Sequence, residues 1–302
     1  MPKLAPRFDD LPVLGPHGFT RVGYTEWGSA DAPRTVVCVH GLTRNSRDFD
    51  FLAQRLVERG VRVVAPDLPG RGRSEFLPRG EDYNTHVYLT AMSALIARLG
   101  VREIDWVGTS LGGHIGMELA ARLGTPIRRL VLNDFGARVP VAALQRIGAY
   151  LRRAHAFATL GEAEAYLRDV YAPFGKLTDA QWRHMAVHGV VQDKAGLKLH
   201  YDPAIVEQFT RPLLLDVVLW GLWEHVTCPT LILRGEDSDL LLPRTVDEMK
   251  RRGRAAEQGL VQSVEIAGCG HAPALMSADQ AALVEDFLFA DAVPAKRSRA
   301  RA

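Results

Sequence analysis

A serine between glycines is the first candidate for chemistry in this chain. Ser110 stands in the run Gly-Thr-Ser-Leu-Gly (108–112), directly after an apolar stretch and directly before a helical pattern. A strand-turn-helix of this kind holds the serine backbone in a strained conformation and lifts its hydroxyl above a sheet. The glycines leave room where a Cβ would collide with neighbouring strands. The same five residues also fit an ordinary glycine turn, so the partners of a nucleophile must be found elsewhere in the chain.

His271 is the candidate base for this serine. A hydroxyl is a weak nucleophile at neutral pH and needs a base, which for such a serine comes after the last strand. His271 follows an alternating apolar segment in the run Gly-Cys-Gly-His (268–271) and precedes the closing helical pattern. Its loop and its place in the chain distinguish it from the other nine of the ten histidines. The order of the two residues therefore predicts a Ser110–His271 pair.

Two backbone N–H groups are expected to form an oxyanion hole beside this pair. Leu111 follows the serine and would donate its N–H from the N-terminus of a helix. Leu42 would supply the second N–H, because it follows His40-Gly41 at the end of an apolar run. We expect His40 itself to pin that loop rather than to react.

The elements that must position these residues alternate between strands and helices. Apolar runs predict strands, several of them buried on both faces of a sheet, at 20–28, 35–41, 61–70, 104–108, 128–134, 230–235 and 262–268. Helical patterns lie between them and close the chain at 277–289. This alternation favours an α/β fold with a mostly parallel sheet and helices on both faces.

One region breaks the alternation. Residues 136–226 show helical patterns only, at 141–157, 160–171, 178–191 and 213–226. The region is too long for a loop in a compact domain. We therefore predict a helical cap, or lid, at 136–226, inserted into a core formed by 1–135 and 227–302.

The composition argues against several kinds of partner. The chain has 302 residues and a formal net charge of +2, too small to indicate a nucleic-acid or membrane partner. No run reaches the roughly 18 apolar residues of a membrane span, and the N-terminus has no apolar core for a signal peptide.

The three cysteines lie far apart, which favours a reduced, cytoplasmic setting. We expect a small-molecule substrate; no oligomeric state is indicated.

No cofactor is expected either. The chain contains no phosphate-binding loop, no dinucleotide fingerprint and no set of residues with the spacing of metal ligands. The predicted chemistry needs only the serine, its base, an acid and the two N–H donors.

Taken in order, six segments resemble the α/β-hydrolase family. They are VCVHGLTRNS, VVAPDLPGRGRS, VGTSLGGHIG, RRLVLND, TLILRGEDS and IAGCGHAPAL. The resemblance covers nearly the whole chain outside the cap and is specific as a set. It implies an eight-stranded sheet, a Ser-acid-His triad and a mobile helical lid.

The resemblance leaves two positions for the acid that would orient His271. In the family it usually lies three residues past the glycine that ends the strand at 230–235. That position is Ser238 here, with Asp239 beside it. A second arrangement in the family places the acid after the preceding strand, where this chain has Asp134. We favour Asp134, because Ser238 could then hydrogen-bond its carboxylate, and keep Asp239 as the alternative.

A serine at this position favours acyl transfer. Epoxide hydrolases and haloalkane dehalogenases resemble this chain but carry aspartate there. Attack on a carbonyl would give an acyl-enzyme on Ser110, which water activated by His271 would hydrolyse. We therefore predict a carboxylic-ester hydrolase in the broad sense, acting on an ester, lactone or thioester.

The cap is expected to select the substrate. Its aromatic residues would pack the cap or line an apolar pocket, which favours a substrate with an apolar part. They are Tyr150, Phe157, Tyr166, Tyr171, Phe174, Trp182, Trp220 and Trp223. Phe174, Trp220 and Trp223 are our candidates for the pocket wall.

Two other functions fit the same residues. Carbon–carbon bond hydrolases of the meta-cleavage type resemble this chain in fold, serine, histidine and cap. The fold could also serve as a small-molecule receptor or a cofactor-free oxygenase. Activity on simple aryl esters that is lost in Ser110→Ala separates the first function from these two.

Overall fold

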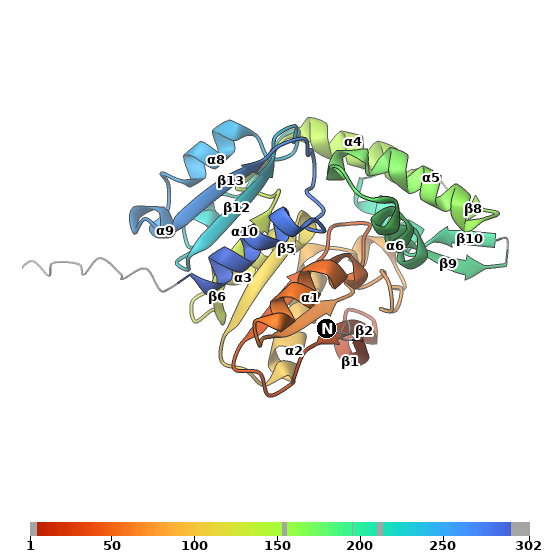
Figure 1. Ribbon diagram of the computed structural model, residues 1–302, viewed down its shortest axis with the longest axis horizontal. Helices are drawn as coiled ribbons and strands as arrows, with labels where there is room; N and C mark the ends of the chain where they lie inside the picture. Colours follow the sequence, from red (N-terminus) through yellow and green to blue (C-terminus); the bar gives the residue numbers. More distant parts are fainter. Residues whose placement is uncertain (1–4, 153–155, 195, 210–213, 291–302) are drawn as a thin grey trace, which may run out of the picture.

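An eight-stranded sheet organises the computed structural model, which describes residues 5–152, 156–194, 196–209 and 214–290 (Figure 1). The strand order is β1-β2-β4-β3-β5-β6-β12-β13. The strands are β1 Arg7–Gly15, β2 Gly18–Trp27, β3 Thr35–Val39, β4 Arg62–Pro66, β5 Ile104–Thr109, β6 Ile127–Asn133, β12 Thr230–Gly235 and β13 Val261–Ile266. Neighbours from β4 to β13 pair in parallel, whereas β1 and β2 pair antiparallel. The predicted mostly parallel sheet is confirmed.

The central strands are buried on both faces, which explains their continuous apolar runs. Successive side chains point to opposite faces of a strand. Val37 and Val39 accordingly belong to one hydrophobic core, and Val36 and Cys38 to the other. β1 was not predicted, because this edge strand buries only Leu11 and Val13 along its length.

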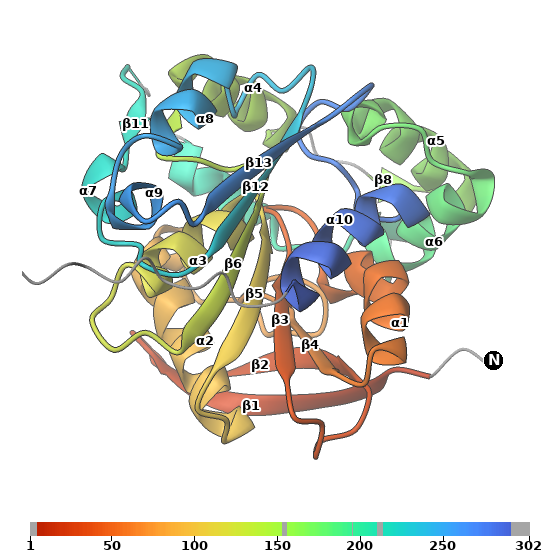
Figure 2. The ribbon, with the colours of Figure 1, turned by 60° about the vertical axis from the view of Figure 1, so that its left-hand side comes forward.

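Helices cover both faces of the sheet, as Figure 2 shows. α1 Asp50–Glu58 and α10 Ala278–Phe289 pack on one face. On the other lie α2 Thr85–Leu99, α3 Leu111–Ala120 and α8 Pro243–Met249. The short α9 Arg254–Glu257 leads into β13. The sheet is thus the middle layer of three, and loops at its carboxyl edge are free to carry functional side chains.

The chain between β6 and β12, which we call the inserted segment (136–226), adds no strand to this sheet in its described residues. Its helices and short strands are β7 Arg138–Val139, α4 Val141–Leu151, β8 Ala156–Phe157, α5 Leu160–Val170, α6 Asp179–Gly189, β9 Val190–Asp193, β10 Gly196–Leu199, β11 Val217–Val218 and α7 Trp220–Trp223, with 3₁₀ turns at Ala172–Phe174 and Pro203–Phe209. Figure 1 shows the elements labelled α4, α5, α6, β8, β9 and β10 beyond one end of the sheet, whereas Figure 2 shows α7 and β11 on the side of α8 and α9.

The expectation that this segment holds no strands is wrong. A three-stranded sheet, β8-β10-β9, and a pair, β11-β7, lie within it. The helix predicted at 178–191 ends at Gly189, where β-branched Val190 and Val191 enter β9. The described part of the helix predicted at 213–226 is helical only at α7, because residues 217–218 pair with β7, and residue 213 lies outside the described residues. The helix predicted at 141–157 ends at Leu151, and residues 153–155 lie outside the described residues.

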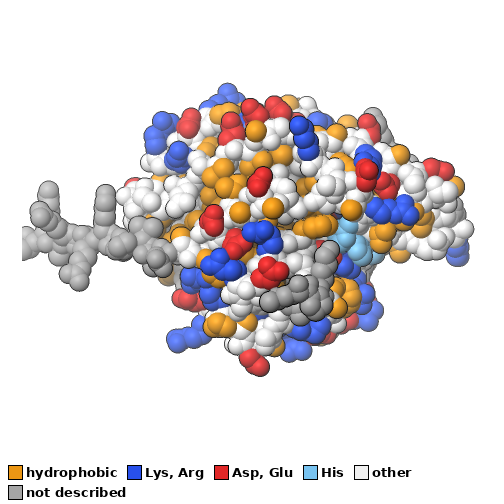
Figure 3. Space-filling model, viewed as in Figure 1, with side chains coloured by type: hydrophobic (Ala, Val, Ile, Leu, Met, Phe, Trp, Pro, Cys, Tyr) orange, Lys and Arg blue, Asp and Glu red, His pale blue; other side chains and the backbone are white. Residues whose placement is uncertain are grey.

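The surface is mixed in charge. Basic and acidic side chains of the described residues are interspersed over the face shown in Figure 3. Among the helices that the structure describes, none is both long enough and apolar enough to cross a membrane.

Candidate active site

Ser110 occupies a strained turn between β5 and α3. Its φ is +52°, in the left-handed region that non-glycine residues rarely adopt. Its N–H donates to the carbonyl of Asn133 at 2.9 Å, which ties the turn to the end of β6. A Cβ on Gly108 would lie 2.2 Å from the Gly112 carbonyl oxygen, and one on Gly112 would lie 2.0 Å from that of Val39. Both glycines are therefore required by close backbone approach, which an ordinary turn would not need.

His271 meets this serine from the loop after β13. The distance from Ser110 Oγ to His271 Nε2 is 2.8 Å. Backbone hydrogen bonds hold the loop on both sides of the histidine, from Gly270 N–H to the Pro173 carbonyl at 2.6 Å and from Ala274 N–H to the Phe174 carbonyl at 3.3 Å. The imidazole is thus fixed against Ser110 by the inserted segment as well as by the core.

Asp134 lies on the far side of the imidazole, at the end of β6. Its Oδ2 is 2.7 Å from His271 Nδ1 and accepts a hydrogen bond of 2.6 Å from Ser238 Oγ. Its Oδ1 accepts one of 2.9 Å from the Gly235 N–H. The carboxylate is fully buried, so these donors replace the water that it lost. An accepting carboxylate requires the proton on Nδ1, which leaves Nε2 to accept the serine proton.

The alternative acid, Asp239, does not reach His271. Its carboxylate pairs with Arg146, at 2.6 Å from Nε and 2.8 Å from Nη2, and about half of its side chain is exposed, at 47%. Ser238 instead occupies the place beside Asp134, and its hydroxyl also accepts the N–H groups of Leu240 and Leu241. The structure therefore brings Asp134, and not Asp239, to the predicted base.

The expected oxyanion-hole residues adjoin Ser110. Leu111 is the first residue of α3, directly after the serine. Leu42 borders the same pocket as Ser110 and His271, and a Cβ on Gly41 would lie 3.6 Å from the Cβ of Ser110. The start of α3 and the loop after β3 therefore lie beside Ser110, as the predicted oxyanion hole requires.

His40 holds the loop that carries Leu42. Its Nδ1 donates to the Gly41 carbonyl at 2.7 Å, and its Nε2 accepts the Leu68 N–H at 2.9 Å. This pairing needs the neutral imidazole, since Nε2 must be unprotonated. Complete burial disfavours the charged form and lowers the pKa of His40 to about 3.

This buried histidine predicts a loss of stability in mild acid. Below about pH 6.5, His40 takes up a proton in the unfolded chain but not in the folded one. The free energy of unfolding should therefore fall by on the order of 1.4 kcal/mol per pH unit as the pH is lowered from 6 to 5. Urea unfolding at each pH measures this slope, which His40→Gln should flatten. The exposed His86, changed to Gln, is the matched control; an equal slope in both variants would contradict the assignment.

The pocket above Ser110 only partly matches the predicted wall. Phe174 lines it, together with Tyr150 and Tyr171. Trp220 and Trp223 do not: the ring of Trp220 packs under the Arg252 guanidinium, 4.8 Å from its centroid, and Trp223 donates its indole N–H to the Arg252 and Met249 carbonyls. Both tryptophans secure α7 to the core, so their prediction as pocket residues is wrong.

The lining residues missed from the sequence are of three kinds. The apolar ones are Phe49, Ile147, Val170, Ala272, Pro273, Ala274 and Met276, the charged ones are Arg44, Asp48 and Arg146, and the uncharged polar ones are Thr43 and Thr109. Arg146, Ile147 and Tyr150 share one face of α4, and the helical spacing of Ile147 and Tyr150 was the available signal. Nothing in the sequence indicated that this face turns toward Ser110.

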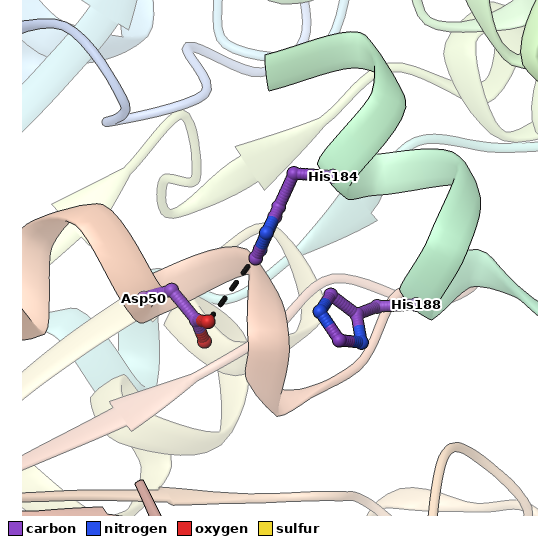
Figure 4. Close-up of side chains that lie close together, drawn as sticks. All are labelled: Asp50, His184 and His188. Carbon is purple, nitrogen blue, oxygen red and sulfur yellow. Dashed lines mark ion pairs between the residues drawn. The ribbon is translucent and has the colours of Figure 1, made fainter. Parts of the chain in front are cut away.

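One further cluster has the chemistry of metal ligands. Asp50 on α1 faces His184 and His188 on α6, with the ligand atoms within 4.8 Å of one another (Figure 4). Arg47, however, bonds both oxygens of the Asp50 carboxylate, and its carbonyl lies 2.9 Å from His184 Nε2. The Arg47 guanidinium therefore already provides the positive charge that a bound metal ion would bring to Asp50. None of the three residues lines the pocket of Ser110.

Comparisons with known proteins agree with this architecture. Residues 36–286 match the model of a family described as the alpha/beta hydrolase family. The 3-hydroxybutyrate-oligomer hydrolase of Cupriavidus necator is 43% identical, over 94% of this chain and 98% of its own length. A solved structure from Rickettsia typhi matches at a TM-score of 0.86 and 30% identity, covering 94% of this chain and 99% of its own. An alpha/beta hydrolase from Novosphingobium aromaticivorans matches at 0.80 and 31%, covering 93% and 98%.

Proposed function

Because this chain belongs to the alpha/beta hydrolase family, we propose that it hydrolyses carboxylic esters formed by short hydroxy acids, of the kind present in 3-hydroxybutyrate oligomers. The observation that carries the proposal is the hydrogen-bonded series Ser110–His271–Asp134, with distances of 2.8 and 2.7 Å. An ester, a lactone and a thioester are the substrates expected. The similarity to a 3-hydroxybutyrate-oligomer hydrolase over nearly its full length favours the ester.

The proposed reaction begins with attack of Ser110 Oγ on the ester carbonyl. His271 Nε2 takes the serine proton, and the buried Asp134 carboxylate stabilises the imidazolium that forms. The tetrahedral oxyanion faces the N–H groups of Leu42 and Leu111. Collapse breaks the bond to the alcohol oxygen, which receives the proton from His271, and leaves the acyl group on Ser110.

Water completes the cycle. His271 accepts a proton from a water molecule as that water attacks the acyl-enzyme, and returns the proton to Ser110 Oγ as the acid leaves. For an ester of a hydroxy acid, the two products are an alcohol end and a carboxylic acid end. Each ester bond that is cleaved therefore consumes one water molecule.

The pocket favours a short acyl group. The cavity measures about 60 Å³, which by this measure holds only a few water molecules, at about 10–15 Å³ each. Ile147, Val170, Phe174 and Met276 form apolar parts of its wall. A four-carbon unit fits such a space better than a long alkyl chain or a ring-derived dienoate.

A substrate panel tests the proposal. We expect 3-hydroxybutyrate dimer and trimer to be cleaved to monomer, and kcat/KM for p-nitrophenyl butyrate to exceed that for the dodecanoate by about tenfold or more, since the long chain cannot be buried in this cavity. A serine-directed phosphonate followed by mass spectrometry should label Ser110.

Two results would overturn it. Preferred turnover of a ring-cleavage dienoate would assign the site to carbon–carbon bond hydrolysis. The absence of turnover of every ester, with no labelling by the phosphonate, would indicate a non-hydrolytic use of the fold.

A further inference from the structure

Two arginines border the pocket that contains Ser110. Arg44 and Arg146 line it together with one aspartate, Asp48. These three side chains thus carry a formal charge of +1. A neutral ester with an apolar acyl group has no use for this charge.

Arg44 has its partner within the wall. Its side chain is buried, its Nε lies 2.9 Å from Asp48 Oδ2, and its Nη2 bonds Oδ1 of the same carboxylate. Its guanidinium also lies over the ring of Tyr171, 5.0 Å from the centroid. Asp48 therefore balances Arg44 inside the pocket, and the excess positive charge belongs to Arg146.

Arg146 is held in place from outside the pocket. Its Nε and Nη2 bind the two oxygens of Asp239, which is not among the lining residues. The ion pair joins α4 to the loop after β12 and fixes the plane of the guanidinium. Nη1 takes no part in this pair, and 45% of the side chain is exposed. A planar guanidinium with one edge fixed by a carboxylate can still bind a second carboxylate through its remaining N–H groups.

We propose that Arg146 binds a free carboxylate on the substrate, so that the enzyme prefers esters that end in an acid. This inference rests on the proposed ester hydrolysis and narrows it. Every linear oligomer of a hydroxy acid has one carboxylate end, which is ionised at neutral pH. Arg146 and Ser110 border one pocket, so the same molecule can place its acid end at the guanidinium and an ester carbonyl at the hydroxyl.

Hydrolysis of matched esters tests the preference. The substrates are 3-hydroxybutyrate dimer and its methyl ester, in which the same ester bond lacks the neighbouring charge. For cleavage of the internal ester bond, wild-type kcat/KM should be higher for the acid than for its methyl ester. Arg146→Gln should lower the ratio of these two kcat/KM values by about tenfold, as expected for loss of a hydrogen bond to a charged group. Raising NaCl from 20 to 500 mM should lower the wild-type ratio and leave that of the variant unchanged.

Arg138→Gln is the matched control. Arg138 also belongs to the inserted segment, pairs with an aspartate, Asp216, and is 46% exposed, but it does not line the pocket. Its variant should keep the wild-type ratio. A thermal unfolding midpoint of Arg146→Gln close to that of Arg138→Gln shows that the fold is intact.

A binding measurement separates this inference from the proposed function. Calorimetric titration with 3-hydroxybutyrate and with its methyl ester is carried out in the Ser110→Ala background, which cannot hydrolyse the ester; the protein that keeps Arg146 should bind the acid about tenfold more tightly than the one that carries Arg146→Gln. If esters are hydrolysed but the ratio is the same in wild type and Arg146→Gln, the carboxylate site is wrong and the ester hydrolase stands. If no ester is hydrolysed, the proposed function fails, and equal binding of the acid and its methyl ester would overturn the carboxylate site as well.

Discussion

Replacing Ser110 by alanine should lower kcat for p-nitrophenyl butyrate by about 10⁴-fold or more, because it removes the atom that forms the acyl-enzyme. Only direct attack of water on the ester, assisted by the oxyanion-hole donors, would remain. The change deletes a single oxygen, which lies 2.8 Å from His271 Nε2, so the fold should persist. Steady-state kinetics and the loss of phosphonate labelling measure the effect.

Ser93→Ala is the matched control for this substitution. Ser93 is an exposed serine on α2, and its variant should keep wild-type kinetics. Thermal unfolding midpoints within about 2 °C of wild type in both variants would exclude loss of fold. Retention of a tenth or more of the activity in Ser110→Ala would rule out an acyl-enzyme on this residue.

Replacing Asp134 by asparagine should lower kcat by about 10³- to 10⁴-fold through the tautomer of His271. Oδ1 accepts the Gly235 N–H, so the amide oxygen takes this position and the amide nitrogen takes that of Oδ2. The nitrogen then donates to His271 Nδ1, where the carboxylate accepted. The imidazole proton moves to Nε2, and the base can no longer accept the serine proton.

The matched variant is Asp239→Asn, the same change at the other candidate acid. Asp239 binds Arg146 at the rim of the pocket and has no contact with the base. Its loss of kcat on the neutral p-nitrophenyl butyrate should be less than about tenfold, as expected away from the reacting groups. Equal, modest losses in the two variants would contradict the assignment of one acid to His271.

The sequence was sufficient to predict most of the core and the reacting pair. Continuous apolar runs revealed the central strands because both of their faces are buried. Ser110 and His271 could be paired because each follows a strand and precedes a helix, in the expected order. The acid could not be decided, since Asp134 and Asp239 follow β6 and β12, which are neighbours in the sheet. The turn after β12 turns Asp239 away from the histidine and directs Ser238 toward Asp134.

The pocket could not be predicted in the same way. Whether a residue lines the pocket depends on which face of its helix turns toward Ser110. Residue type alone does not determine that orientation. Trp220 and Trp223 have the composition of a pocket wall but pack against the Arg252 region. Arg146, a charged residue on an amphipathic helix, has the pattern of a solvent-exposed position and yet borders the pocket.

The two backbone hydrogen bonds on either side of His271 have a mechanical consequence. Pro173 and Phe174, whose carbonyls accept from Gly270 and Ala274, belong to the inserted segment, and Phe174 is also part of the pocket wall. The loop of His271 and the part of the pocket wall formed by Phe174 are therefore tied together at this point. If the inserted segment is exchanged for that of a relative, His271 keeps its position only if the new segment keeps the backbone path at 172–174. Because these bonds use main-chain atoms, substitutions of the side chains there alter selectivity without releasing the histidine.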